Sequence, residues 1–327
     1  MRVIAIRENQ LVLEERPAPT PEKGEVRVRV HATAVNRADL LQVRGGYAAP
    51  PDAVQDVPGL EYAGVIDAVG PGAHRRRVGD RVFGLVGGGS YAEALVVHEE
   101  LTCALPEGLD FTAAAALPEA YLTAYDAMVT QAGLAAGETV LIHAVGSGVG
   151  TAAVQIARAV GARSIGTART EEKLDDARAL GLDVGLLVQN AQFSSAVLEH
   201  TGGRGVDVVL DLVGGDYFGE SAAGAAPRGR LVLVGLLAGP RCDLDLVTVL
   251  RKRLTLRGTV LRSRPFEERI AGARVLERHL SPLFATSRLT PVVHAVLPLE
   301  RAAEAHALVA KNVGFGKIVL DCGASPG

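Results

Sequence analysis

Residues 138–162 read ETVLIHAVGSGVGTAAVQIARAVGA, and this stretch predicts a strand, a glycine turn and a helix in succession. Residues 139–144 are apolar and β-branched, as expected for a buried strand of a parallel sheet. Residues 151–160 continue with helix-forming Ala, Gln, Ile and Arg. The small residues of the turn are Gly146, Ser147, Gly148 and Gly150. At such a junction the amides of the helix start can bind the pyrophosphate of a dinucleotide.

The turn departs from the usual dinucleotide fingerprint. Its six residues read V-G-S-G-V-G, so Val145 and Ser147 stand where G-x-G-x-x-G has its first two glycines. Taken alone, this pattern also fits a tight strand–helix turn in any α/β protein. The sequence on either side of the turn favours the dinucleotide site.

The order of the expected elements predicts an α/β protein in two parts. Residues 1–121 are rich in short strand patterns and poor in helical ones, which indicates a compact β-rich domain. From residue 122 to 261, strands and helices alternate at βαβ spacing, which predicts a doubly wound parallel sheet of the Rossmann type. Strands are expected at residues 26–31, 60–68, 81–85, 92–97, 139–144, 164–167, 206–211, 230–234, 254–260, 292–298 and 317–321, and helices at 151–160, 171–180, 266–283 and 300–311.

Composition disfavours several classes of protein. The chain has 327 residues, 48% of them hydrophobic, and a net charge of −3. The basic runs 74–77 and 251–253 have no interleaved aromatic residues, so we interpret both as solvated surface and expect no nucleic-acid binding. We expect neither a membrane span nor a secretory signal, because apolar runs are short and the chain opens on the strand-like MRVIAI. The three cysteines are far apart, which suits a cytoplasmic enzyme or binding protein without a zinc-binding cysteine pair.

The end of the second Rossmann strand favours NADP(H) over NAD(H). An acidic residue there would accept a hydrogen bond from the ribose 2′-hydroxyl, whereas basic and small polar residues leave room for a 2′-phosphate. This chain has Arg169 and Thr170 at that place, with Lys173 one turn into the next helix. The alternative is that Arg169 and Lys173 are solvated surface cations and Thr170 only caps the helix.

Several further stretches carry a family resemblance. They are HATAVNRADLLQVRGGYAAPP (31–51), VPGLEYAGVIDAVGPG (57–72), VGDRVFGL (78–85) and FGKIVL (315–320). With the glycine turn, they resemble the medium-chain dehydrogenase/reductase superfamily over nearly the whole chain. NRADLLQVRGGY resembles the quinone oxidoreductase branch, the zeta-crystallin-like proteins. HAVGSGVGTAAVQIA (143–157) and LRSRP (261–265) look closest to its tumour-suppressor-inducible group.

The resemblance implies a GroES-like domain of residues 1–121, completed by 262–327, and a Rossmann domain of residues 122–261 that binds NADPH. It implies a cofactor and a small-molecule acceptor between the domains, and a homodimer joined through the Rossmann edge strand near residues 254–260. One position departs from the family pattern. Many relatives have Asn-Tyr after the third Rossmann strand, where this chain has Leu187 and Val188, so the adenine contacts are left open.

The residues do not suit a catalytic zinc. Zinc-dependent relatives have a Cys at the place of Asn36 and a His at the place of Leu60, and neither residue replaces those ligands. Glu61 alone does not hold the ion, and the four-cysteine structural lobe is missing because residues 87–90 lead straight to Tyr91. We therefore expect no metal.

Without a Lewis acid, the chemistry narrows to acceptors that delocalise negative charge, namely quinones and α,β-unsaturated carbonyls. Catalysis then depends mainly on positioning, with a hydroxyl donor nearby. By resemblance the candidates are Tyr47, Ser147 and Asn36. Alternatively, Tyr47 packs on Pro50 or Pro51, and Ser147 and Asn36 are only turn residues.

Other cofactor contacts follow from the resemblance residue by residue. Thr123 matches a residue near the phosphate and ribose, although helix packing would also explain it. Lys317 matches a lysine that reaches the cofactor region, although it could also be a surface lysine at a strand end. His143 is interpreted as a satisfied core residue and not as a base. The remaining expected contacts are Gly146, Ser147, Gly148, Val149 and Gly150 in the turn, with Gly235, Leu236, Leu261, Arg262 and Ser263 flanking the nicotinamide.

Three functions remain open from the sequence. The favoured one is an NADPH:quinone reductase. The second is an NADPH-dependent alkenal or enoyl-thioester reductase, and the third is a non-catalytic NADPH-binding protein.

Overall fold

The computed structural model describes residues 1–323 and divides the chain into two compact units. Unit 1 comprises residues 1–122 and the C-terminal stretch from Leu261, and unit 2 comprises residues 123–260. Helix α3 (Pro118–Tyr125) crosses the first boundary. None of the described helices is both long and apolar enough to cross a bilayer.

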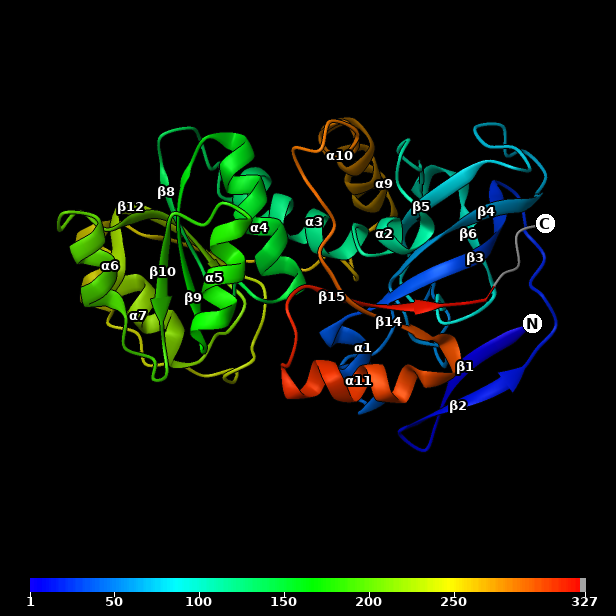
Figure 1. Ribbon diagram of the computed structural model, residues 1–327, viewed down its shortest axis with the longest axis horizontal. Coiled ribbons are helices and arrows are strands. Elements are labelled where there is room, and N and C mark those ends of the chain that lie inside the picture. The colour runs from blue at the N-terminus through cyan, green and yellow to red at the C-terminus, as the bar shows by residue number, and fades with distance from the viewer. Residues whose placement is uncertain (324–327) are drawn as a thin grey trace. The chain divides into compact units, whose positions relative to one another are not determined.

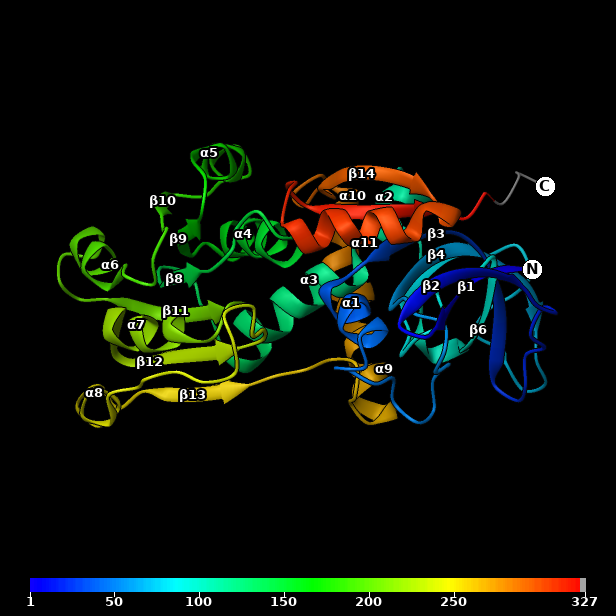
Figure 2. The ribbon, with the colours of Figure 1, turned by 90° about the horizontal axis from the view of Figure 1, so that it is seen from below.

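Unit 2 is built on a six-stranded sheet in which every strand pair is parallel. The strand order is β10-β9-β8-β11-β12-β13, the Rossmann order with its chain reversal beside β8. Figure 2 shows β13 at the edge of this sheet, next to β12. The strands are β8 (Thr139–Ile142), β9 (Arg163–Ala168), β10 (Val184–Leu187), β11 (Val206–Asp211), β12 (Ala225–Leu233) and β13 (Thr255–Gly258).

The central strand β11 reads VDVVLD and is buried along its whole length, because helices cover both faces of a parallel sheet. Two of its apolar residues, Val206 and Val209, belong to a core cluster. This cluster includes Leu141, Ile165 and Leu231 from three other strands. The helices of unit 2 are α4 (Gly148–Val160), α5 (Glu171–Ala179), α6 (Ser194–His200), α7 (Asp216–Gly224) and α8 (Leu246–Lys252), together with the π-helical segment η2 (Asp126–Gln131). The predicted Rossmann-type sheet is confirmed.

Unit 1 contains a seven-stranded sheet with the main order β14-β15-β3-β4-β5-β7, and β6 pairs with β3. Figure 1 shows β15, near the C-terminus, in this sheet with β3 from the N-terminal half. Both halves of the unit contribute to one apolar core, which contains Val28, Ile66, Leu299 and Leu320. The C-terminal segment therefore completes the β-rich domain, and the predicted GroES-like architecture is confirmed.

The strands of unit 1 are β1 (Arg2–Arg7), β2 (Gln10–Glu15), β3 (Glu25–Val35), β4 (Glu61–Val69), β5 (Arg81–Leu85), β6 (Ala94–His98), β7 (Thr102–Ala104), β14 (Val293–Pro298) and β15 (Lys317–Asp321). Its helices are α1 (Arg37–Val43), α2 (Phe111–Ala115), α9 (Phe266–Val275), α10 (Ser281–Ala285) and α11 (Ala302–Lys311), with the short segments η1 (Glu99–Leu101), η3 (Leu276–Leu280) and η4 (Leu299–Arg301). The single helix predicted at 266–283 is instead α9, a π-helical η3 and α10. Pro282 in the first turn of α10 has no N–H to donate, which explains the change of winding.

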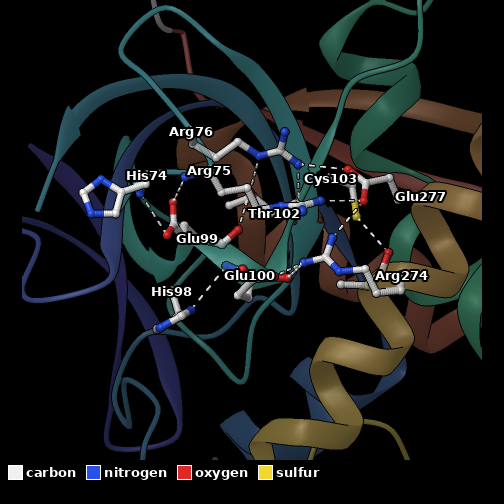
Figure 3. A network of polar contacts seen from close by, with 11 residues as sticks. His74, Arg75, Arg76, His98, Glu99, Glu100, Thr102, Cys103, Arg274 and Glu277 are labelled. Atoms are coloured by element: carbon white, nitrogen blue, oxygen red, sulfur yellow. Dashed lines mark hydrogen bonds and ion pairs between the residues drawn. The ribbon is translucent and has the colours of Figure 1, made fainter. Parts of the chain in front are cut away.

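The basic run 74–77 takes part in a half-buried ionic network, so its interpretation as solvated surface is wrong for Arg76. Figure 3 shows Arg75, Arg76 and Arg274 gathered around Glu277. The Arg76 side chain is only 11% exposed and also donates to the Thr102 hydroxyl at 2.7 Å. The network ties the loop before β5 to the α9–η3 junction.

The second basic run, 251–253, also contributes to packing. The Lys252 ammonium donates to the carbonyl oxygens of Ala223 and Ala225, at 2.5 and 2.7 Å. These carbonyls lie at the end of α7 and the start of β12, so Lys252 anchors α8 to that junction. For Lys252, too, the interpretation as solvated surface is wrong.

Candidate functional site

The glycine turn of unit 2 is closed by a helix cap. Ser147 is the N-cap of α4, and its hydroxyl accepts a hydrogen bond from the Gly150 amide at 3.0 Å. A side chain at Gly150 would place its Cβ 2.3 Å from the Ala144 carbonyl oxygen, so only glycine fits there. This third glycine brings the start of α4 against the end of β8, and α4 begins three residues earlier than predicted. The first amides of α4 remain available to an anion.

Two cations lie beside this turn. Arg169 follows β9 and is exposed, and it forms no ion pair with any described residue. Lys173 is half-buried, and a Cβ on Gly146 would lie 2.7 Å from its Cδ, so its alkyl chain lies against the turn. Burial lowers the pKa of Lys173, and the nearby Arg169 charge lowers it further. Two positive charges next to helix-start amides form a site suited to phosphate.

Two buried oxygens in unit 2 have no hydrogen-bond partner among the described residues. They are the Thr123 hydroxyl and one carboxylate oxygen of Asp211, which ends β11. The other Asp211 oxygen accepts from the amides of Val213 and Gly214, both at 2.8 Å. Buried polar groups are normally paired, so these oxygens have capacity left for a ligand. The residues of unit 2 therefore fit a phosphorylated dinucleotide.

His143 is a structural residue, as predicted. Its ring nitrogens lie 3.0 Å from the Thr167 hydroxyl and 2.8 Å from the Ser221 hydroxyl. Burial lowers its pKa to about 4, so the ring is neutral at physiological pH.

The other predicted contacts of unit 2 lie at strand and helix ends. Thr170 is the exposed N-cap of α5, and Gly148 and Val149 form the first turn of α4. Gly235 follows β12, where a Cβ would lie 2.5 Å from the Leu212 carbonyl oxygen, and Leu236 is 51% exposed. These positions leave room beside the strand ends, and their contacts with a cofactor stay a prediction.

In unit 1, Asn36, Glu61 and Lys317 form a buried polar cluster. The Lys317 ammonium lies 2.8 Å from Glu61 Oε1 and donates to Asn36 Oδ1 at 2.5 Å, while Asn36 Nδ2 donates to the same Glu61 oxygen at 2.7 Å. The side chains of Lys317 and Glu61 are 6% and 0% exposed. The alternative of a surface lysine is therefore wrong. Asn36 is also the N-cap of α1, so it is both a turn residue and a member of the cluster.

Tyr47 and Arg262 lie together in unit 1. The Arg262 guanidinium stacks over the Tyr47 ring at 5.2 Å and donates to the Tyr47 carbonyl oxygen at 3.2 Å. Arg262 is buried and also donates to Gln42 Oε1 at 2.6 Å. Burial raises the pKa of the half-buried Tyr47, and the charge of Glu119 raises it further. The neighbouring Leu261 is half-buried, and Ser263 is exposed.

Sequence reasoning missed two carboxyl groups near this cluster, Asp39 and Glu119. Asp39 is buried on α1, accepts from the amides of Asn36 and Gly59, and has its pKa raised to about 6 by burial. Glu119 lies at the start of α3 and lines a cavity with Leu60 and other residues of unit 1. Its signal in the sequence is weak: it is one acidic residue inside the otherwise apolar run LPEAYL.

Comparisons with known proteins agree with this architecture. A model of the alcohol dehydrogenase GroES-like domain matches residues 22–107, and a model of the zinc-binding dehydrogenase family matches residues 148–275. Human quinone oxidoreductase is 32% identical over 305 residues, covering 92% of this chain and 90% of its own length. The chain belongs to the quinone oxidoreductase-like medium-chain dehydrogenases/reductases.

Two further matches describe relatives of this oxidoreductase. A mycobacterial protein whose structure was solved with NADPH is 31% identical and superposes with a TM-score of 0.90, covering 98% of this chain and 100% of its own. Erythronolide synthase EryA2 of Saccharopolyspora erythraea is 44% identical over 225 residues, which is 67% of this chain but only 6% of the synthase. The protein is thus an oxidoreductase of a family that uses NAD(P)H.

The zinc suggested by the name of the matching family model does not fit the residues of this oxidoreductase. Among residues 1–323, no group of three or more His, Cys, Asp and Glu side chains is arranged to hold a metal ion. The Glu61 carboxylate is taken up by Lys317, by Asn36 and by the Glu119 amide, which donates to its other oxygen at 2.8 Å. An ammonium therefore supplies the positive charge next to Glu61.

Proposed function

We propose that this protein is an NADPH-dependent, zinc-independent quinone reductase. The observation that carries the choice of cofactor is the pair Arg169 and Lys173 beside the glycine turn of α4. A 2′-phosphate would give these cations the anionic partner that Arg169 lacks among the described residues. When bound, the reduced nicotinamide supplies a hydride.

The cluster of unit 1 supports a quinone as the acceptor. A reduced quinone spreads its negative charge over an aromatic ring, so it needs less stabilisation than the alkoxide formed from a simple ketone. Tyr47 carries a hydroxyl donor, and Arg262 holds that loop in place through its ring and backbone contacts. We infer that Tyr47, Ser147 and Asn36 contact the reacting groups.

The experiment that tests the function compares ortho- and para-quinones with 2-alkenals, using NADPH and NADH side by side. We expect NADPH oxidation with quinones, and trapping of semiquinone radicals distinguishes one-electron from hydride transfer. No turnover of any quinone would overturn the proposal, and NADPH binding without consumption would support a non-catalytic role.

Arg169→Asp tests the cofactor assignment. Two lost charge-assisted hydrogen bonds, at about 1.5–3 kcal/mol each, correspond to a fall in kcat/KM for NADPH of roughly 10²-fold or more. The value for NADH should change far less, and Arg178→Asp, at an arginine that is paired with Asp175 within α5, is the control. Equal losses with both cofactors would remove Arg169 from this role.

Reduction of an activated alkene is the second candidate. It is favoured by the 44% identity to a segment of a synthase named for making erythronolide and not for reducing quinones. Faster turnover of 2-alkenals or enoyl thioesters than of any quinone would select it.

We also infer a homodimer through the edge strand β13. All four of its residues are exposed, and Leu246 and Leu250 on the neighbouring α8 are 68% and 76% exposed. A free sheet edge next to exposed leucines is suited to pairing with a second copy.

The exposed free thiol of Cys242 supports a reducing, cytoplasmic location.

The motifs at residues 143–157 and 261–265 support membership of the tumour-suppressor-inducible group. Comparing the acceptors that this protein reduces with those of that group would test the assignment.

A further inference from the structure

Glu119 stands out among the acids of unit 1 because its half-buried carboxyl group pairs with none of the described residues. Its backbone amide is held by Glu61 Oε2 at 2.8 Å, which fixes the start of α3. No described residue forms a hydrogen bond or ion pair with the Glu119 carboxyl oxygens themselves. A half-buried carboxyl group without a protein partner is available to water.

The carboxyl group borders a cavity with room for water. The cavity volume is about 40 Å³, and one water needs roughly 10–15 Å³, so the cavity has room for a few waters. Most of its lining is apolar, as at Leu60, Leu122 and Leu276. Arg269 also lines it, and the buried Nε of Arg269 has no hydrogen-bond partner in the described part of the chain. A buried N–H beside a cavity of this size is suited to an ordered water.

The charges around Glu119 come from four separate segments of unit 1. Glu61 on β4 and Asp39 on α1 disfavour its ionised form, while Lys317 on β15 and Arg262 favour it. Burial is the largest effect and, with Glu61, raises the pKa of Glu119 to about 7. The group therefore exchanges its proton near physiological pH.

Glu119 is connected to Tyr47 of the candidate acceptor site through Arg262. Its charge acts on the hydroxyl of Tyr47, and both residues interact with the Arg262 guanidinium. Arg262 borders the same cavity as Glu119 and stacks on the Tyr47 ring. Glu119 and Arg262 therefore border one cavity, and Arg262 connects this cavity to the Tyr47 loop.

We propose that Glu119 is the proton donor for the reduced acceptor and that it recovers its proton through water in the adjoining cavity. This proposal rests on the quinone reductase function proposed above. Two-electron reduction of a quinone to a hydroquinone takes one hydride from the dinucleotide and one proton from solvent. The Glu119 O–H bond breaks as an O–H bond forms on the acceptor, which leaves the carboxylate. A water in the cavity then returns a proton to the carboxylate, and the solvent restores the water.

The first test needs no cofactor. We would follow the carboxyl carbons of ¹³C-glutamate-labelled protein by NMR and identify Glu119 by its absence in Glu119→Gln. A titration midpoint near 7 is expected, and a midpoint near the ordinary glutamate value of about 4.3 would overturn the proposal. Folding is checked in the same samples. Because the raised pKa makes the ionised form unfavourable in the folded protein, the melting temperature of Glu119→Gln should rise above that of the wild type between about pH 4.5 and pH 7. The difference should be complete above about pH 7.

The second test uses the pH profile with NADPH and a quinone. The wild-type rate should fall as the pH rises through about 7. Glu119→Gln should lose about 10²-fold in kcat at pH 6 and lose this pH limb, because a neutral amide cannot donate the proton. Glu119→Asp should retain the limb, and Glu107→Gln on an exposed loop is the matched control.

The outcomes separate the two proposals. A wild type that reduces quinones while Glu119→Gln keeps its rate and pH profile would overturn the role of Glu119 alone. A wild type that reduces no quinone would overturn the proposed function, and the role of Glu119 with it. If the rate of Glu119→Gln still falls as the pH rises through about 7, whatever the size of that rate, another group transfers the proton.

Discussion

Replacing Lys317 by methionine would remove the ammonium that pairs with the buried Glu61 carboxylate. The two side chains are 6% and 0% exposed, so solvent cannot screen the charge that is left. Breaking such a pair from one side costs about 3–5 kcal/mol. Glu61 keeps its hydrogen bonds from Asn36 and from the Glu119 amide, so we expect the lower end, about 3 kcal/mol.

The assay is thermal unfolding followed by circular dichroism, without cofactor, because a ligand would shift the melting temperature by itself. At about 2–4 °C per kcal/mol for a domain of this size, Lys317→Met should lower the Tm by roughly 6–12 °C. The control is the double variant Lys317→Met/Glu61→Gln, which removes both charges and should regain most of the loss. A single variant as stable as the wild type, or a double variant no more stable than the single one, would refute the reasoning.

Three further predictions follow from the contacts. Burial alone would raise the pKa of Glu277, but hydrogen bonds from Arg76 and its neighbours hold the pKa below the ordinary value. Glu277→Gln should therefore lower the free energy of unfolding by about 1–3 kcal/mol at pH 7. In urea titrations this difference from the wild type should disappear as the pH falls below about 4.5, and a difference that persists in acid would contradict the ionic origin. Gly150→Ala would place a Cβ 2.3 Å from a carbonyl oxygen, so NADPH affinity measured by fluorescence titration should fall at least 10-fold, and an unchanged Kd would contradict the close packing of the turn. Leu250→Glu should convert the proposed dimer to monomers in sedimentation velocity, and a dimer that survives the change must use another surface.

Local signals predicted most of unit 2. Each strand and its following helix lie close together in the sequence, so the period of apolar residues predicted five of the six strands and helices α4 and α5. Strand β10 and helices α6, α7 and α8 were not predicted. The glycine turn could be read for the same reason, since Ser147 and Gly150 contact each other across three residues. The start of α4 was placed three residues too late, because glycines suggest a loop and the cap by Ser147 was not recognised.

The site in unit 1 could be predicted only in part. Asn36 and Lys317 were selected through resemblance, but their meeting with Glu61 joins three segments from both halves of the chain. The buried position of Arg76 was missed because a basic run has the same composition whether it is solvated or paired with Glu277.

The sequence by itself determined the order of elements, the Rossmann-type sheet, the glycine turn and the cations after β9, because these depend on neighbours a few residues away. Only the tertiary structure decided which charges are buried together. It removed Lys317 from the surface and left the carboxyl group of Glu119 unpaired beside a cavity. The physical reason is that burial and the approach of distant charges set the chemistry of a titratable group, and neither is encoded in the residues next to it.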